Sequence, residues 1–239
     1  MEIKHSLTFP YKPPTDDLKK RYKHIFSLKN PIKIPLFKLV FDKVFSGLIL
    51  FFIVAPVLLL LKIAYVIEGL IVKENSGPLL FFYWAVSAGK RVKKYKLRLI
   101  KQKFIDKELA KKNDWNAYTA EWNNESRTVL GTFIKKFYLD ELPQFYSVFI
   151  GDMSIVGPRP LCEMHYEMDL KQGNITRKLL RGGLLGLGHI NKGTTEMGNP
   201  LYEYEYIDQI MNKNSFSIML LDISIIWKGI KLIVKGGGH

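Results

Sequence analysis

Cysteine is almost missing from this sequence, which holds a single one, Cys162, in 239 residues. No disulfide can therefore form within the chain, which fits a reducing compartment for its soluble part. Because no second cysteine or clustered histidine accompanies Cys162, the sequence gives no indication of a zinc site. An export signal would place a hydrophobic core near residue 1, but the first forty residues are polar, basic and broken by prolines. We expect no cleavable signal.

Acidic residues are also scarce. Asp and Glu number 22 against 36 Lys and Arg, so the formal net charge is +14 and the pI is near 9.6. A chain this basic is expected to meet an anionic partner, and nucleic acid, phosphorylated small molecules and lipid headgroups all qualify. Apolar residues make up 47% and charged residues 24% of the chain. That balance excludes a disordered chain and a protein built mainly of membrane spans.

One long apolar run stands out, at residues 44–61, and it carries no charged side chain. It reaches the roughly 18 residues typical of a membrane helix, with a helix buried in a soluble core as the alternative. Pro56 lies inside the run and predicts a kink. Basic side chains at both ends favour a re-entrant helix that enters and leaves by the cytoplasmic face, with a crossing helix and snorkelling lysines as the alternative. These flanking residues are Lys33, Lys38, Lys43, Lys62 and Lys73.

Two other segments mix basic or polar residues with apolar ones. Residues 90–112 are dense in Lys and Arg, and we expect either a solvated amphipathic helix or a surface that lies on anionic headgroups. Residues 216–234 are mostly apolar but contain Asp222 and Lys228. This pattern predicts an amphipathic helix at a core or a membrane surface.

The stretch FIKKFYLDELPQFYSVFIGDMSIVGPRP, residues 133–160, carries the chemistry. Asp140 and Glu141 are adjacent and would point about 100° apart on a helix, so one could attack an electrophile while the other holds a metal. At least one of Lys135 and Lys136, about one turn earlier, can approach Asp140. Prolines on both sides stiffen the chain around Arg159, whose guanidinium can grip a phosphate with two donors. Taken separately, adjacent acids also complement a helix N-terminus, and a Pro-Arg-Pro is usually a loop.

Together these pieces resemble a known signature. DELPQF at residues 140–145, followed by GDMSIVGPRP at residues 151–160, closely resembles the motif of the bacterial sugar transferases, the monotopic polyprenyl-phosphate phosphoglycosyl transferases that initiate glycan synthesis. The resemblance extends weakly from about residue 35 to residue 234. It includes FDKVFSG before the apolar run and YKLR at residues 95–98, which looks like the family's YKFR. Residues 1–35 lie outside it.

The resemblance implies a specific reaction. Asp140 would be the nucleophile that attacks the sugar-linked phosphorus of a UDP-sugar, releasing UMP. Polyprenyl phosphate, in bacteria undecaprenyl phosphate, would then take the phosphosugar from the enzyme. Glu141 would assist, and Asp140 and Glu141 would bind Mg²⁺ through the substrate phosphates. The residues expected to bind substrate or phosphate are Arg159, Lys135, Lys96, Arg98, Pro158 and Gln144.

The resemblance also implies a fold and a place. We expect a mainly α chain with little β: a polar, proline-rich extension at 1–35, a re-entrant membrane helix at 36–68, and a catalytic domain at 69–239. Amphipathic helices would hold a small catalytic core at the cytoplasmic face of the bacterial inner membrane, against anionic lipids. A homo-oligomer or glycan-assembly partners are possible in this class. Nucleic acid is not needed to explain the basic charge.

The sequence departs from the family pattern at three positions near the expected site. Tyr83 and Ala85 stand where the family usually has a glutamine and an arginine, and Lys135 replaces an arginine five residues before the nucleophile. Lysine keeps the charge but loses the two-donor fork. These changes affect donor recognition more than the chemical step. They leave open an unusual donor, a partner that completes the site, or a non-catalytic scaffold in a glycan-assembly complex.

Overall fold

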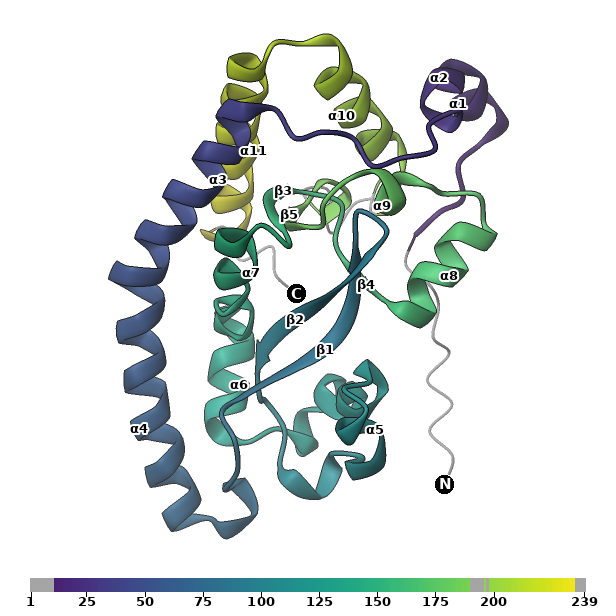
Figure 1. Cartoon of the computed structure of the whole chain (residues 1–239). Coiled ribbons are helices and arrows are strands. Elements are labelled where there is room, and N and C mark those ends of the chain that lie inside the picture. The colour runs from purple at the N-terminus through teal and green to yellow at the C-terminus, as the bar shows by residue number, and fades with distance from the viewer. Residues whose placement is uncertain (1–10, 190–195, 197, 235–239) are drawn as a thin grey trace.

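Helices make up most of the part of the chain that the computed structural model describes, residues 11–189, 196 and 198–234 (Figure 1). The prediction of a mainly α fold with little β is therefore confirmed. The α-helices are α1 (Asp16–Arg21), α2 (Lys23–Phe26), α3 (Leu36–Ile49), α4 (Ala55–Ile71), α5 (Lys107–Lys111), α6 (Val129–Lys136), α7 (Gln144–Ile150), α8 (Glu163–Lys171), α9 (Thr176–Leu179), α10 (Leu201–Asn212) and α11 (Ser215–Val234). The 3-10 helices are η2 (Lys73–Asn75), η3 (Gln102–Phe104), η4 (Trp115–Trp122), η5 (Asn124–Ser126), η6 (Leu139–Glu141) and η7 (Leu187–His189).

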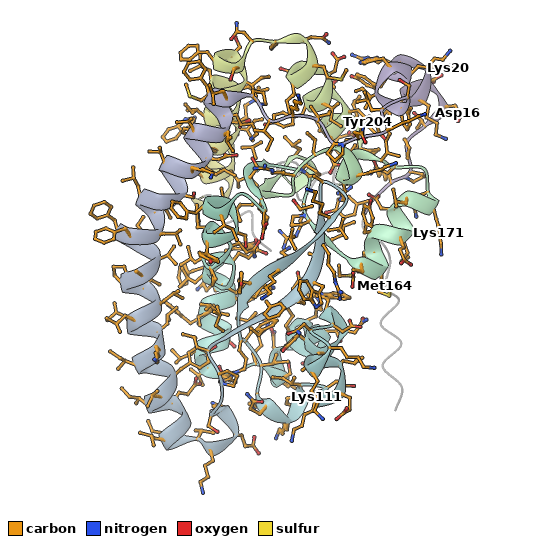
Figure 2. The ribbon with its side chains drawn as sticks, in the orientation of Figure 1. Asp16, Lys20, Lys111, Met164, Lys171 and Tyr204 are labelled. Carbon is orange, nitrogen blue, oxygen red and sulfur yellow. The ribbon has the colours of Figure 1, made fainter. Side chains whose placement is uncertain are left out.

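One helix among the described residues is long and apolar enough to cross a membrane. It runs from Leu36 to Ile71 through α3, the π-helical segment η1 (Leu50–Val54) and α4, and only 17% of its most apolar stretch is buried. The alternative of a helix buried in a soluble core is therefore wrong. Figure 2 shows that the side chains on its outer side are almost entirely carbon. Its most exposed large apolar side chains are Leu36, Phe51, Phe52, Leu60, Leu70 and Ile71.

Pro56 lies in the first turn of α4, directly after the π-helical segment. A proline inside an α-helix has no N–H to donate, and its ring collides with the carbonyl four residues earlier. The wider π-helical turn accommodates both effects, and the Ala55 N–H donates to the Leu50 carbonyl five residues back. The helix is therefore continuous through Pro56, and its two halves run in different directions in Figure 1.

A β-hairpin crosses the centre of the molecule. β1 (Leu80–Ser87) pairs antiparallel with β2 (Lys90–Leu97), and β4 (Leu161–Cys162) joins the other edge of β1. The two-residue turn has positive φ at both Ala88 (51°) and Gly89 (70°), which matches the twist of a tight hairpin. Figure 1 shows the hairpin between the column of α6 and α7 and the helices α5 and α8.

The expectation of an amphipathic helix over residues 90–112 is wrong for its first third. Residues 90–97 form β2, in which burial has a period of two: Val92, Lys94 and Lys96 share the buried face while Lys93 is exposed. Because Lys and Arg are so frequent in this segment, the alternation of buried and exposed positions cannot be recognised from the sequence. A helix does occur further along, in the short α5.

The main hydrophobic core surrounds a second, parallel pair of strands, β3 (Ser154–Gly157) and β5 (Gly183–Gly186). Gly183 is needed there, because a Cβ on it would lie 2.2 Å from the backbone nitrogen of Gly157. Residues from the N-terminal extension belong to this core as fully as those of α10 and α11. Core residues include Leu18, Tyr22, Ile25, Val148, Ile155, Leu179, Tyr204, Ile207 and Ile218.

The amphipathic helix predicted over residues 216–234 is confirmed as α11, and its polar residue Asp222 points inward. The ammonium of Lys38 in α3 lies 2.6 Å from the Asp222 carboxylate and 3.7 Å from that of Asp42, and it donates to the Val156 carbonyl at 3.2 Å. Asp42 also accepts a hydrogen bond from Ser154 Oγ at 2.7 Å. This buried charge network joins the apolar helix to α11 and to β3.

Replacing Lys38 with methionine should therefore destabilise the protein strongly. The substitution leaves two buried carboxylates without their shared cation, and loss of one partner of a buried ion pair costs about 3–5 kcal/mol. Thermal unfolding in lipid nanodiscs measures the effect, with Lys43→Met, an exposed lysine of the same helix, as the control. Equal thermal midpoints for the two variants would contradict this account of the network.

Candidate active site

The signature residues lie where α6 ends and the chain reverses. Tyr138 adopts a left-handed conformation with φ 55°, which ends α6 and starts η6. The reversal brings Asp140 back toward the last turn of α6, where Lys135 Nζ lies 3.9 Å from Asp140 Oδ2. Lys136 is exposed. The expectation that one of the two lysines approaches Asp140 is met by Lys135.

Asp140 is buried, 1% exposed, and it belongs to a cluster of four charges. Lys96 from β2 lies 3.0 Å from Asp140 Oδ2 and 3.3 Å from the Glu121 carboxylate, and Lys135 lies 3.4 Å from the same Glu121. Burial by itself lowers the pKa of Lys96, but the two carboxylates outweigh it and raise that pKa. Burial likewise raises the pKa of Glu121, and the two ammonium groups reverse the shift. Lys96 is therefore held in its charged form beside Asp140.

Two buried polar groups at this point have unused hydrogen-bonding capacity. Among the described residues, none donates a hydrogen bond to either carboxylate oxygen of Asp140, although the Lys96 ammonium is near. One turn later the Gln144 side chain is 1% exposed, and its Nε2 has no hydrogen-bond acceptor within the same residues. Buried polar atoms are seldom left unpaired in folded proteins.

Glu141 faces a different partner from Asp140. Its carboxylate forms a two-point ion pair with Arg159, in which Nη2 contacts Oε1 and Nη1 lies 3.5 Å from Oε2. Burial by itself raises the pKa of the Glu141 carboxyl, but Arg159 and nearby lysines outweigh it and hold that pKa well below its usual range. The two acids thus point to separate cations, as expected for adjacent positions on a short helix.

The backbone around Arg159 is fixed from two sides. The Pro158 carbonyl accepts the Gly183 N–H at 2.8 Å, which ties the segment to β5. The Arg159 carbonyl accepts a hydrogen bond from Arg177 Nε at 3.0 Å. Pro158 itself is buried and contributes to the site through its backbone. The Arg159 side chain is 31% exposed, so a ligand can reach it.

Arg98 is the one predicted phosphate-binding residue that the structure directs elsewhere. Its guanidinium donates to the backbone carbonyls of Pro78 (2.9 Å), Ile100 (2.7 Å) and Asn75 (2.7 Å), and the side chain is almost fully buried. These contacts join the segment after α4 to the end of β2. Within the described residues Arg98 forms no ion pair with either acid of the signature. A phosphate-binding role for Arg98 stays a prediction without a contact to support it.

Sequence reasoning missed Lys94, which faces the site from β2. The side chain is 2% exposed, its Nζ donates to the Pro160 carbonyl at 3.4 Å, and it lies 5.8 Å from the ring centroid of Tyr83, its partner across the hairpin. Burial, followed by the positive charge of Arg159, lowers the pKa of Lys94 to about 7. The signal that could have found it is the strand period, because Lys94 and Lys96 lie two residues apart and share a face.

Glu121 and Tyr83 were also missed as site residues. Glu121 comes from η4, and only the tertiary fold brings it to Lys96 and Lys135. Tyr83, at a position where the sequence departs from the family pattern, is buried on the same face of the hairpin as Lys94. Burial raises the pKa of the Tyr83 phenol, so the ring stays neutral.

The residues present fit a magnesium ion only if a substrate shares it. Among the described residues there is no group of three or more His, Cys, Asp or Glu placed to hold a metal. Asp140, however, offers buried carboxylate oxygens that accept no hydrogen bond from those residues. Mg²⁺ usually takes one or two carboxylates together with substrate phosphates. The carboxylate of Glu141 is already engaged by Arg159.

Comparison with known proteins agrees with the motif. The family described as bacterial sugar transferase matches residues 34–236. UDP-glucose:undecaprenyl-phosphate glucose-1-phosphate transferase of Klebsiella pneumoniae is 30% identical over 204 residues, which cover 83% of this chain and 38% of the relative. The UDP-N-acetylgalactosamine-undecaprenyl-phosphate N-acetylgalactosaminephosphotransferase of Aeromonas hydrophila is 32% identical over 175 residues, 71% of this chain and 38% of the relative.

The chain belongs to the bacterial sugar transferase family. It spans less than two fifths of the length of these two curated relatives, 38% in each case. The match begins at residue 34, so almost all of the N-terminal extension lies outside it.

Lys94→Met should make the protein more stable at neutral pH. An unfolded lysine has a pKa of about 10.4, while burial and Arg159 lower that of Lys94 to about 7. Between these two pKa values the unfolded chain binds more protons than the folded protein. The presence of Lys94 therefore lowers the free energy of unfolding most near pH 7 and progressively less toward pH 10. We expect the free energy of unfolding of Lys94→Met to be about 1–3 kcal/mol higher than that of the wild type at pH 7.

The measurement is thermal unfolding at pH 7, 8 and 9. The advantage of Lys94→Met over the wild type should shrink as the pH rises, while Lys93→Met, at an exposed position of the same strand, should match the wild type throughout. A destabilised Lys94→Met protein at pH 7 would mean that Lys94 makes a net stabilising contact.

Proposed function

We propose that this chain is a phosphoglycosyl transferase that moves a sugar-1-phosphate from a UDP-sugar to polyprenyl phosphate, in bacteria undecaprenyl phosphate. The observation that carries the proposal is the buried Asp140 carboxylate, which lies between Lys96 and Lys135 and accepts no hydrogen bond from the described residues. Relatives with similar sequences are named as UDP-sugar:undecaprenyl-phosphate transferases. The reaction would be the first membrane step of a glycan pathway.

In the first step, a carboxylate oxygen of Asp140 attacks the sugar-linked phosphorus of the donor. The new P–O bond forms as the bond to UMP breaks, and UMP leaves with the electron pair. Lys96 and Lys135 lie 3.0 Å and 3.9 Å from Asp140 Oδ2, where their positive charges would compensate charge on the transferred phosphate. The phosphosugar is then attached to Asp140.

In the second step, a phosphate oxygen of the polyprenyl carrier attacks the same phosphorus. The P–O bond to Asp140 breaks, which restores the carboxylate and yields a polyprenyl diphosphate sugar. Covalent catalysis of this kind lets a soluble nucleotide sugar and a lipid use one centre in turn. Arg159 would bind a substrate phosphate through the guanidinium donors that its ion pair with Glu141 leaves over, and its side chain is partly exposed.

Magnesium, when bound with the donor, would neutralise diphosphate charge and stabilise the departing phosphate. Asp140 would contact it while the substrate phosphates supply other oxygens. Gln144, with its amide nitrogen lacking an acceptor in the described structure, is placed to donate a hydrogen bond to the phosphosugar. Lys94 adds a further cation on the same face of the hairpin.

We also propose that the apolar helix is re-entrant in the bacterial inner membrane, with the catalytic part on the cytoplasmic side. Both of its ends are anchored to the same body of the protein. Near its start, Lys38 binds Asp222. Near its end, Glu68 Oε1 accepts the Val129 N–H at 2.9 Å, and the Tyr65 hydroxyl donates to the Arg98 carbonyl. A helix that crossed the membrane would have its two ends on opposite sides of the bilayer. One water-soluble body could then not contact the helix both near Lys38 and near Glu68. Anionic headgroups would surround the flanking lysines.

Asp140→Asn should abolish UMP release. An amide of the same size cannot form the covalent phosphosugar linkage, so we expect a loss of at least about 10³-fold. Release is measured in nanodiscs with Mg²⁺ and undecaprenyl phosphate across a panel of UDP-sugars, with Asp152→Asn, an acid outside the ion pairs of the site, as the control. Release that survives the substitution would exclude Asp140 as the nucleophile. No release by folded wild type with any donor would favour a non-catalytic scaffold or a missing partner.

A cysteine-labelling experiment tests the re-entrant path. In a Cys162→Ala background, Lys33→Cys and Lys73→Cys place one thiol at each end of the apolar helix, and both positions are exposed. A membrane-impermeant maleimide should label both in inverted vesicles and neither in intact spheroplasts. A crossing helix would instead expose one of the two positions in spheroplasts.

A further inference from the structure

The N-terminal extension is built into the protein, although it precedes the matched family region. Helices α1 and α2 place Leu18, Tyr22 and Ile25 in the main core. The rings of Tyr22 and Phe26 stack on Tyr204 of α10, with centroids 6.0 Å and 4.9 Å away. Tyr204 is labelled in Figure 2, next to these two helices. The described part of the extension, residues 11–35, is therefore packed into the fold.

The first described residue of the extension reaches a buried arginine. Tyr11 is only 6% exposed, and Cζ of Arg177 lies over its ring, 4.1 Å from the centroid. That distance is within the range of a cation–π contact. Burial raises the pKa of the Tyr11 phenol, while the charges of Arg177 and Arg159 oppose the rise. Tyr11 is thus close to both arginines. The Lys12 N–H, which donates to the Gly198 carbonyl at 3.0 Å, fixes the chain beside it.

Arg177 in turn fixes the backbone of the phosphate-gripping residue. Its Nε donates to the Arg159 carbonyl at 3.0 Å, and its other nitrogens are 2.8 Å from Asp169 and 2.9 Å from Glu203. The edges of the guanidinium are therefore engaged by these three acceptors, and the Tyr11 ring covers it from another side. A buried network of this kind holds a fixed geometry only while every charge in it stays paired and shielded from water.

We propose that Tyr11 is a positioning residue, through which the N-terminal extension holds Arg177 and so sets the backbone of Arg159 for donor binding. The proposal rests on the phosphoglycosyl transferase function for its kinetic consequence, but its structural part does not. Without the Tyr11 ring, water reaches Arg177 and its hydrogen bond to the Arg159 carbonyl loosens. The donor phosphate then meets Arg159 in a less well defined position. We therefore expect weaker donor binding, with a smaller effect on the rate of the chemical step.

The kinetic test compares three variants in nanodiscs. Tyr11→Ala should raise the donor KM about tenfold and change kcat less than about threefold. Tyr11→Phe keeps the ring over Arg177 but removes the side-chain hydrogen bond with it, so it should raise the donor KM clearly less than Tyr11→Ala. Tyr22→Leu is the matched control, because it removes a buried tyrosine of the same extension that lies against Tyr204. It should lower the thermal midpoint and leave the donor KM unchanged. An equal rise in KM for Tyr22→Leu and Tyr11→Ala would overturn the proposal, since the extension would then act through stability alone.

A second readout requires no turnover. Folded protein is treated with phenylglyoxal, which modifies accessible arginines, and Arg177 is followed by peptide mass spectrometry. We expect Arg177 to be protected in the wild type, Tyr11→Phe and Tyr22→Leu, and modified in Tyr11→Ala. Equal protection in all four proteins would overturn the proposal even if the enzyme is active. If no UDP-sugar is turned over by the wild type, the transferase function fails, and the modification pattern still decides the role of Tyr11.

Discussion

Charged side chains that leave water must find partners, and this protein buries many of them. Each buried cation of the two networks is set between two carboxylates: Lys38 between Asp42 and Asp222, and Lys96 between Glu121 and Asp140. Arg177 follows the same rule with Asp169 and Glu203. Such pairs add little net stability over apolar packing, but a misplaced partner is expensive. The pairing therefore selects one arrangement of helices and strands, and the site inherits its geometry from that selection.

The same pairing connects the apolar helix to the chemistry. Asp42 in α3 accepts a hydrogen bond from Ser154, the first residue of β3. β3 ends at Gly157, directly before the Pro-Arg-Pro segment, and Arg159 then reaches Glu141 at the end of η6. At the far end of the helix, Glu68 accepts hydrogen bonds at the start of α6, whose last turn carries Lys135. Both halves of the apolar helix are thus linked through a few bonded residues to the two acids of the signature.

The sequence predicted those features that leave a local pattern. The apolar helix and α11 have long apolar runs, and the DELPQ and GPRP motifs located Asp140, Glu141 and Arg159. The hairpin was missed because lysines occupy its buried face, which a hydrophobicity pattern reads as exposed. Glu121 and Lys94 were missed because their partners come from distant segments. Arg98 was chosen for its place in the YKLR motif, yet its donors meet backbone carbonyls. The sequence thus located Asp140, Lys96 and Lys135, but not the Glu121 carboxylate that lies near both lysines.

The distance along the chain between Lys38 and Asp222 has a consequence for biosynthesis. The two residues are separated by 184 positions. At about 5–20 residues per second, a ribosome completes the apolar helix at Ile71 about 8–30 s before it makes Asp222. During that interval the helix can enter the bilayer while its lysine is still hydrated at the surface. The ion pair between Lys38 and Asp222 can form only after α11 has been synthesised.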